Sequence, residues 1–396
     1  MIFNINTAYF SKLLKPITSG AYSSETVWLN ATADFLNATV VTKRRVTASV
    51  SVKCRDNPVL DYLCQSPGSG AINARILQKN LAAMRSATIS VEFPEMASMT
   101  SLPDRSEEQT FHMSNSISIS TDMVNCNSDQ KFKITAKTLM DGLLAVKHAM
   151  GIETTRPHYC GILLEMGKDS CRFIAGNGAF FAIKSIKNKN LIRNKNDKRL
   201  FLSSECVATI LSSLAAIPDQ LLECKVISNN NVIVISSPNV LLYVDNMLDS
   251  AKNYPSVDKV LDYNYPHKLY VDTEEFKYAA AGMAATYTKE EQRCVYIWTI
   301  EMIVDIVAGQ ILFKKDTKAL RKVPLNLNTI SVGAAEPINL KCQSGYLTRA
   351  YRQFRSSKEL IIRCENKNQP IVIESVNRAA SKGNYDIIFF GSSKRE

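Results

Sequence analysis

The sequence is poor in the residue patterns that build catalytic centres. Its 396 residues include only four histidines, and these form no HExxH or similar cluster. Its ten cysteines include no CxxC pair, so we interpret them as buried apolar side chains rather than metal ligands or disulfides. Neither a GxxxxGK[ST] phosphate loop nor a GxSxG elbow occurs. Metal catalysis, nucleotide hydrolysis and serine hydrolysis therefore have no recognisable motif here.

Long apolar runs are also missing. No run approaches the ~18 residues that cross a bilayer, and residues 1–17 lack the charged-then-apolar layout of a signal peptide. We therefore expect a cytosolic protein without cofactor or metal, and a bacterial, organellar or phage origin is left open. Acidic residues are outnumbered, 37 against 48 basic ones, which gives a net charge of +11. That excess suggests an anionic partner such as nucleic acid, and a merely soluble basic protein is the alternative.

An internal repeat organises what is present. Its template has two apolar residues two apart, as on one face of a strand. Three more apolar positions follow five, nine and twelve residues beyond the second, as on one face of a helix. The template recurs six times, at evenly spaced starts: Phe3, Gly70, Phe132, Leu200, Leu269 and Leu340. Gly70 is the only one of the thirty template positions that is not apolar.

Each copy continues into strand-like segments separated by turn residues such as NNN, SPN and NKNQP. One unit therefore reads as strand, helix and three strands. Because one helix cannot cover so many strands, we expect the units to pair into α+β domains with helices on one face and sheets outside. The predicted domains are residues 1–130, 131–266 and 267–396. The polar stretch MTSLPDRSEEQT (99–110) reads as a surface loop.

The predicted helices carry charge of mostly one sign on the face away from the apolar stripe. The first nine residues of the six helices, counted from the first apolar position, include one acid, Asp141. For any single basic residue, a solvated surface is the simpler explanation. A shared positive lining, however, suits a phosphate backbone bound without base readout. The candidate DNA-binding residues are Lys12, Lys15, Lys79, Arg85, Lys147, Lys277, Arg349, Arg352 and Arg355.

Four segments carry a family resemblance. They are TTRPHYCGILLE (154–165), FIAGNGAFFA (173–182), NYPSVDKVL (253–261) and KCQSGYL (341–347). In order and spacing they resemble conserved segments of the bacterial-type DNA sliding clamp, the beta subunit of DNA polymerase III. The repeat order and domain size extend the resemblance over the whole chain.

The resemblance implies a head-to-tail homodimeric ring around double-stranded DNA, which confers processivity and performs no catalysis. It implies docking of the DNA polymerase catalytic subunit and the clamp loader in an apolar cleft. The alternative for Phe180 and Phe181 is ordinary strand core, and for Pro255 a simple turn. Carried over by local match, the cleft residues are Tyr159, Gly178, Phe180, Phe181, Pro255, Lys259, Val260, Gln343 and Tyr346.

The chain departs from the family pattern in places that bear on partners. Gly176-Asn177-Gly178 stands for the usual T-D-G, and Phe180 and Phe181 replace the Arg-Leu that follows it. The ending IIFFGSSKRE lacks the family's M-P-hydrophobic-R, and family members tend to be acidic rather than basic. There are two alternatives to a replication clamp: a clamp-fold scaffold or DNA-binding paralogue outside replication, and an enzyme built on scattered carboxylates such as Asp141, Glu165 and Asp169.

Overall fold

The computed structural model covers the chain in segments. The described residues are 1–18, 26–41, 47–53, 62–92, 97–102, 108–111, 130–152, 156–167, 170–187, 198–215, 217–227, 232–237, 240–286, 299–315, 318–332, 336–343, 354, 357–365, 370–375 and 385–390. They fall into two compact units. Unit 1 holds residues 1–141, 190–196 and 200–248, and unit 2 holds 142–189, 197–199 and 249–396.

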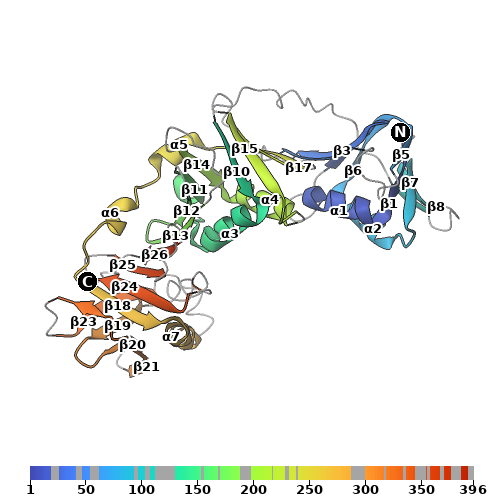
Figure 1. The fold of residues 1–396 in the computed structure, drawn as a ribbon. Helices are drawn as coiled ribbons and strands as arrows, with labels where there is room; N and C mark the ends of the chain where they lie inside the picture. Colours follow the sequence, from blue (N-terminus) through green and yellow to red (C-terminus); the bar gives the residue numbers. More distant parts are fainter. Residues whose placement is uncertain are drawn as a thin grey trace. The chain divides into compact units, whose positions relative to one another are not determined.

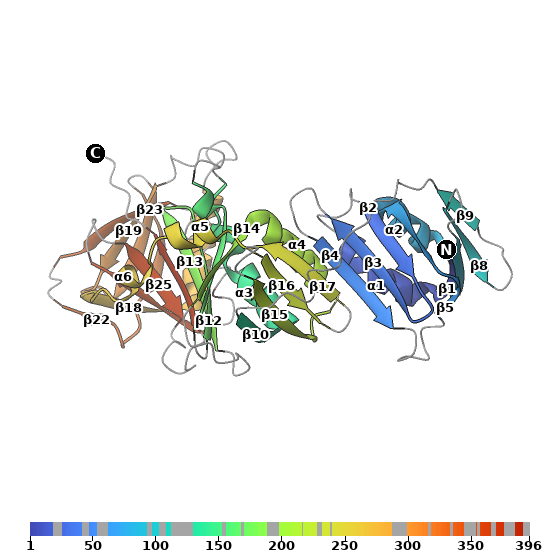
Figure 2. The ribbon, with the colours of Figure 1, turned by 90° about the horizontal axis from the view of Figure 1, so that it is seen from above.

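Unit 1 contains two antiparallel sheets (Figures 1 and 2). The five-stranded sheet has the order β5 (Leu63–Ser66), β1 (Ile2–Asn6), β7 (Thr88–Glu92), β8 (Ala97–Leu102) and β9 (Glu108–Phe111). The eight-stranded sheet has the order β10 (Gln130–Thr135), β15 (Leu221–Ile227), β16 (Val232–Ser236), β17 (Val240–Asp245), β4 (Thr47–Lys53), β3 (Phe35–Val41), β2 (Thr26–Ala31) and β6 (Gly68–Asn73). The prediction of a surface loop at residues 99–110 is therefore partly wrong. Its polar residues pair at a sheet edge in β8 and β9, where one face needs no apolar cover.

Unit 2 contains a nine-stranded and a four-stranded sheet. The larger has the order β14 (Lys198–Ser203), β11 (Gly161–Met166), β12 (Ser170–Gly176), β13 (Phe180–Lys187), β26 (Tyr385–Phe390), β25 (Ile371–Ser375), β24 (Glu359–Cys364), β18 (His267–Asp272) and β22 (Ile330–Ser331). The smaller has the order β21 (Lys318–Pro324), β20 (Gln310–Lys315), β19 (Thr299–Asp305) and β23 (Ile338–Gln343).

The helices follow the repeat. They are α1 (Thr7–Thr18), α2 (Ala74–Ala83), α3 (Ala136–Val146), α4 (Ser204–Leu214), the short α5 (Leu248–Asn253) and α6 (Asp258–Leu261), and α7 (Thr273–Ala285). In the first five copies every template position is buried except the half-buried Leu211, and Leu340 and Phe354 of the sixth copy are fully buried. The predicted strand-helix pattern is confirmed for these copies. The predicted sixth helix lies outside the described residues.

Each helix starts at the same point of the repeat, because the residue after the second apolar position is an N-cap. The Asn73 side chain accepts hydrogen bonds from the backbone N–H groups at the start of α2. Asn6, Thr135, Ser203 and Asp272 do the same for α1, α3, α4 and α7, at 2.8 to 3.2 Å. The chain thus turns from strand to helix at a fixed place in each of these copies.

The helices α1, α4 and α7 pack against strands of the sheets. In unit 1, α1 and α2 lie side by side, with α1 against β3 and β4 (Figure 2). The Gln78 amide nitrogen on α2 donates to the Thr18 hydroxyl of α1 at 2.7 Å. In unit 2, α7 lies against β18, β20 and β21 (Figure 1). The template residues belong to the buried core between helices and sheets.

The strands are exchanged within each pair of copies by one rule. The first strand of a copy pairs with the second strand of its neighbour, so β1 pairs with β7 and β6 pairs with β2. The last strands then join successive pairs: β4 pairs with β17, and β13 pairs with β26. Strands from both sides of residues 130 and 266 therefore share sheets. Compact units consequently do not follow the predicted three-domain division, which we retain as a proposal below.

Candidate nucleic-acid and partner interfaces

Exposed basic residues gather on the first two helices. Lys12 and Lys15 on α1 and Lys79 on α2 are exposed, as is Arg85 just beyond α2. Neither helix has an acidic residue in its sequence. Arg75 on α2 is also exposed. It was not predicted, because it precedes the first apolar helix position, from which the basic residues were counted. This part of the chain presents exposed positive charge suited to phosphate oxygens.

The other described helices are less basic. α4 has no Lys or Arg, and α7 has two acids in its first turn. Lys277 on α7 is half-buried, and its ammonium donates to the Glu274 carboxylate at 2.5 Å. Lys147 follows α3 and is exposed, as is Lys137 in the first turn, which the sequence analysis also missed. Positive charge is therefore unequally distributed among these helices. Arg349, Arg352 and Arg355 lie outside the described residues.

Several predicted cleft residues come together in an aromatic cluster, which we define as Tyr159, Phe181, Tyr254 and Phe389. The rings of Phe181 and Phe389 are stacked, with centroids 4.8 Å apart and planes 11° apart. Tyr159 meets Phe181 and Tyr254 edge-on, at 6.0 Å in both cases. Tyr254 and Phe389 were not predicted, although Tyr254 directly precedes Pro255. Tyr159 is half-buried and brings the cluster to the surface of unit 2.

The turn before β13 shapes the edge of this cluster. Gly178 has a φ of +93°, and a side chain there would crowd the Tyr159 ring. The Asn177 side chain accepts hydrogen bonds from the backbone N–H groups of Ala179 and Phe180, at 3.0 and 2.8 Å. A Cβ on Gly176 would lie closer than 3.0 Å to the ring of Phe181. The Gly-Asn-Gly sequence thus leaves room for a ring at position 181.

Phe180 and Phe181 point to opposite faces of β13, as strand geometry requires. Phe180 is fully buried, stacks with Phe390 at 6.4 Å between centroids, and lies 5.8 Å from the His148 ring. It belongs to the core, which was the alternative interpretation of this residue. We therefore leave Phe180 out of the candidate interface and retain Phe181.

The remaining predicted cleft residues are divided between two places. Pro255 and Val260 are half-buried and Lys259 is exposed, and all three lie in the segment that includes Tyr254. Gln343 ends β23, where its backbone pairs with Thr299. By the repeat it occupies the position that caps the other helices. Tyr346 lies outside the described residues.

Ion pairs surround the segment that carries Pro255 and Lys259. Arg172 on β12 donates to Asp258 at 2.7 Å between Nη1 and Oδ1, and it also pairs with Glu165 of β11. The Arg172 guanidinium holds the pKa of Asp258 below its ordinary value. Burial raises the pKa of the Tyr254 phenol, so that group stays neutral at physiological pH. The segment is thus anchored by charge at Asp258 and by apolar burial at Tyr254.

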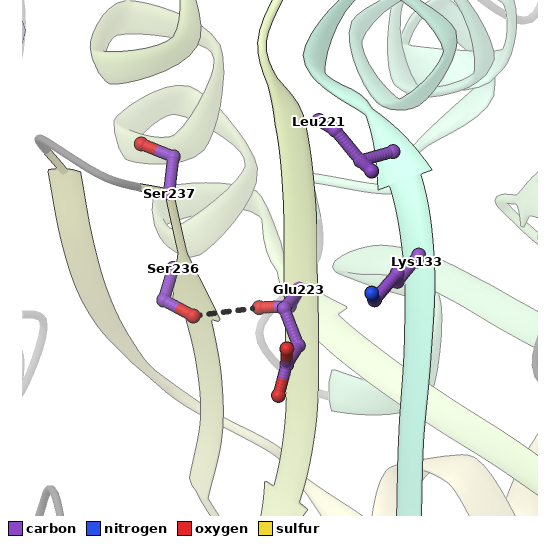
Figure 3. Close-up of a pocket in the computed structure, with 5 residues that line it drawn as sticks. All are labelled: Lys133, Leu221, Glu223, Ser236 and Ser237. Atoms are coloured by element: carbon purple, nitrogen blue, oxygen red, sulfur yellow. Dashed lines mark hydrogen bonds between the residues drawn. The ribbon is translucent and has the colours of Figure 1, made fainter.

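A shallow pocket of about 240 Å³ lies on the strands of unit 1 (Figure 3). Leu221, Ser237 and the cross-strand row of Lys133, Glu223 and Ser236 line it. The Ser236 hydroxyl donates to the Glu223 carbonyl at 3.1 Å, and Glu223 also pairs with Lys225 at 3.7 Å. These are ordinary contacts of a solvated sheet face, and we assign the pocket no role.

In the described part of the chain, no three His, Cys, Asp or Glu side chains are grouped so that they could hold a metal ion. No described helix combines the length and apolar character needed to span a membrane.

The fold matches that of bacterial DNA sliding clamps over the whole chain. The structure of the DNA polymerase sliding clamp from Pseudomonas aeruginosa with ligand superimposes with a TM-score of 0.80 at 13% identity, and that from Bacillus subtilis with 0.79 at 14%. The DNA polymerase III beta subunit of Thermotoga maritima gives 0.75 at 10%. Each comparison covers 100% of both chains.

Sequence comparison gives no such match: no family model and no curated protein corresponds to the chain. At this identity the structural similarity establishes the fold. The chain has the DNA clamp fold, as the family resemblance implies.

Proposed function

We propose that this chain is a ring-forming DNA sliding clamp that tethers a replicative DNA polymerase to its template. The observation that carries the proposal is the structural match to sliding clamps along the entire chain. The basic surfaces of α1 and α2 support it, because a clamp needs weak, sequence-independent phosphate contacts and no base readout. In this proposal the chain is non-catalytic, needs no cofactor, and divides into three domains at residues 130 and 266.

The strand-pairing rule supports a head-to-tail ring. Within the chain, the last strand of one copy pairs with the last strand of another, as β4 does with β17 and β13 with β26. Two last strands, β9 and β21, are end strands of their described sheets. Continuing the rule pairs β21 of one chain with β9 of the next, which also removes an exposed edge. In a closed ring of two chains, both such edges would be paired.

Opposite charge favours the same pairing. β21 has the sequence KALRKVP and is basic, whereas β9, with the sequence EQTF, follows Asp104 and Glu107 in the chain. Strand edges of opposite charge attract each other, whereas two copies of the same edge carry like charges and repel each other. We propose this strand pair as the homodimer interface.

The aromatic cluster is the proposed docking surface for the polymerase catalytic subunit and the clamp loader. Interfaces are enriched in aromatic side chains, which contribute large apolar area with few rotatable bonds. Exposed Lys259 adds a positive charge in the segment beside the cluster. The proposed partner segment therefore combines an apolar side chain with a nearby carboxylate.

The decisive experiment compares retention on circular and linear DNA. The clamp and its loader are incubated with nicked circular plasmid, and bound clamp is counted after gel filtration before and after linearisation. A ring that encircles DNA stays on the circle and slides off the linear product. Negative-stain images should show closed two-chain particles with a hole wider than the ~20 Å duplex. Equal retention on both DNAs, or compact particles without a hole, would refute the proposal.

A further inference from the structure

Residues 249–265, here called the strap, cross the outer face of the nine-stranded sheet. The cross-strand row beneath runs from Phe181 through Phe389 and Val372 to Arg363. At the first end, the Tyr254 ring meets Phe181 edge-on at 6.4 Å between centroids. At the last end, Arg363 donates to the Leu261 carbonyl at 3.0 Å.

Apolar burial fixes the strap to the sheet as a whole. Tyr254, Val257, Leu261 and Tyr265 are each at most 4% exposed. The strap is not a strand of that sheet. Its backbone hydrogen bonds close locally, from Val260 to Val257 and from Asp262 to Asp258. Its position along the row must therefore be set by side chains that reach it from the strands.

Three arginines make those connections. Arg199 on β14 donates to the Tyr254 carbonyl at 3.3 Å, and Arg172 reaches Asp258 through both of its terminal nitrogens, at 2.7 and 3.4 Å. Arg363 holds the Leu261 carbonyl, and its guanidinium lies 5.4 Å from the centre of the Tyr265 ring. The tethers are spaced along the strap, with Arg172 beside the residues proposed to meet partners.

Glu165 orients two of these arginines at once. It lies directly across from Arg172 in the β11–β12 pairing. One of its oxygens pairs with Arg172, and the other accepts from Arg199 Nε at 3.1 Å. Arg172 and Glu165 have side-chain exposures of 25% and 19%, whereas Asp258 is 47% exposed. Because the ion pair between Arg172 and Asp258 is partly exposed to solvent, it contributes little to the free energy of unfolding. Its main effect is to fix the position of Asp258.

We propose that Arg172 is a positioning residue for partner docking. By holding Asp258, it fixes Pro255, Lys259 and Val260 relative to the aromatic cluster. This inference rests on the proposed clamp function, because it assigns a role within the same docking surface. Without the tether, the strap keeps its apolar anchors but samples other positions, and a partner must select the competent one.

The test removes either side of the tether. Arg172→Met and Asp258→Asn are compared with Asp258→Glu, which keeps the charge, and with Lys225→Met. The last is the matched control because Lys225 and Glu223 form an ion pair of similar exposure within β15 of unit 1, whereas the strap belongs to unit 2. The probe is a synthetic peptide copying the C-terminal segment of the polymerase catalytic subunit from the same genome. Its affinity is measured by fluorescence anisotropy, and amide exchange of the strap by mass spectrometry.

We expect Arg172→Met and Asp258→Asn to weaken peptide binding about three- to tenfold, as for loss of a modest coupling, and to speed exchange in the strap. Asp258→Glu should recover most of the affinity, and Lys225→Met should change neither reading. DNA retention should stay at the wild-type level in Lys225→Met, whereas the two tether variants should load less well because the clamp loader is proposed to dock on the same surface. Unchanged affinity in the two tether variants would overturn the proposal, whether or not exchange rises.

The wild-type measurement separates this inference from the proposed function. If the unaltered protein is retained on circular DNA but binds no peptide, the polymerase-docking part of the proposed function fails. Exchange in the strap then still decides whether Arg172 and Asp258 act as a tether. If the strap exchanges its amide hydrogens at the wild-type rate in both tether variants, the tethering role of Arg172 and Asp258 is refuted as well.

Discussion

Gly176→Ala is the substitution that most directly tests the packing of the aromatic cluster. A Cβ at this position would lie closer than 3.0 Å to three atoms of the Phe181 ring. To restore van der Waals contact, the ring must withdraw by about 1 Å. Phe389 stacks on that ring, and Tyr159 and Tyr254 meet it edge-on. The ring therefore has little room to move.

The expected cost follows from these contacts. Overpacking a filled site costs about 1–3 kcal/mol, and replacing glycine lowers the entropy of the unfolded chain, which returns about 0.4–1 kcal/mol. We expect a net loss of about 1–2 kcal/mol in the free energy of unfolding, measured by urea denaturation. Gly167→Ala is the control, because a Cβ there meets Ser170 at 3.4 and 3.5 Å, which is ordinary contact.

A double variant identifies the cause. Phe181→Leu shortens the side chain that the new methyl group would strike, so Gly176→Ala should cost less in that background. The coupling energy between the two changes should be at least about 1 kcal/mol. Full stability of Gly176→Ala, or strictly additive effects of the two substitutions, would refute the proposed packing of Phe181 over Gly176.

Three further predictions concern charge. Replacing Lys12 and Lys15 by Gln should lower the slope of log affinity for DNA against log salt by about two, at 0.9 per phosphate contact, whereas Lys277→Gln should leave the measured slope unchanged because Glu274 already pairs with that lysine. Burial lowers the pKa of His267 below 6.5; its stabilising contribution is therefore full above pH 6.5 and is lost as the pH falls through the folded-state pKa. In His267→Asn, the urea midpoint should change less between pH 7 and 5 than in the wild type. Equal pH dependence of the midpoint in the two proteins would contradict this. Arg363 donates to the Glu374 carboxylate at 3.3 Å, and Glu374 is only 6% exposed. Arg363→Met strands this carboxylate and should cost about 3–5 kcal/mol in urea unfolding; an unchanged midpoint would show that the pair is not buried in solution.

The repeat was predictable because it depends only on apolar periodicity. Any apolar residue satisfies a template position, so Ile5, Leu202 and Val271 can occupy equivalent places without sharing an identity. The cap position was available in the sequence as well, since Asn6 and Asn73 directly follow the second apolar residue of their copies. Strand exchange between copies was not predictable, because it depends on pairing between segments far apart in the chain.

The candidate interfaces were predicted less completely. Alternation along β13 could have separated Phe180 from Phe181, but it could not show which of them faced the helices. Phe389 entered the cluster through the pairing of β13 with β26, which joins residues about 200 positions apart. Arg172 and Glu165 carried no motif, and their role follows only from the strap that lies across their sheet. Charge counts found the basic helices but missed that Glu274 compensates Lys277.

The low identity to bacterial sliding clamps and the shared fold have one physical explanation. Strand exchange makes each described sheet depend on at least two copies of the repeat, so each copy must keep its apolar template and its helix cap. Those demands constrain the residue class and seldom the residue itself. The outer face of β13 is under no such demand, and there Gly176 and Phe181 form a pair that excludes side chains larger than glycine at position 176. The fold can therefore stay constant while this surface changes, provided that Gly176 and Phe181 change together.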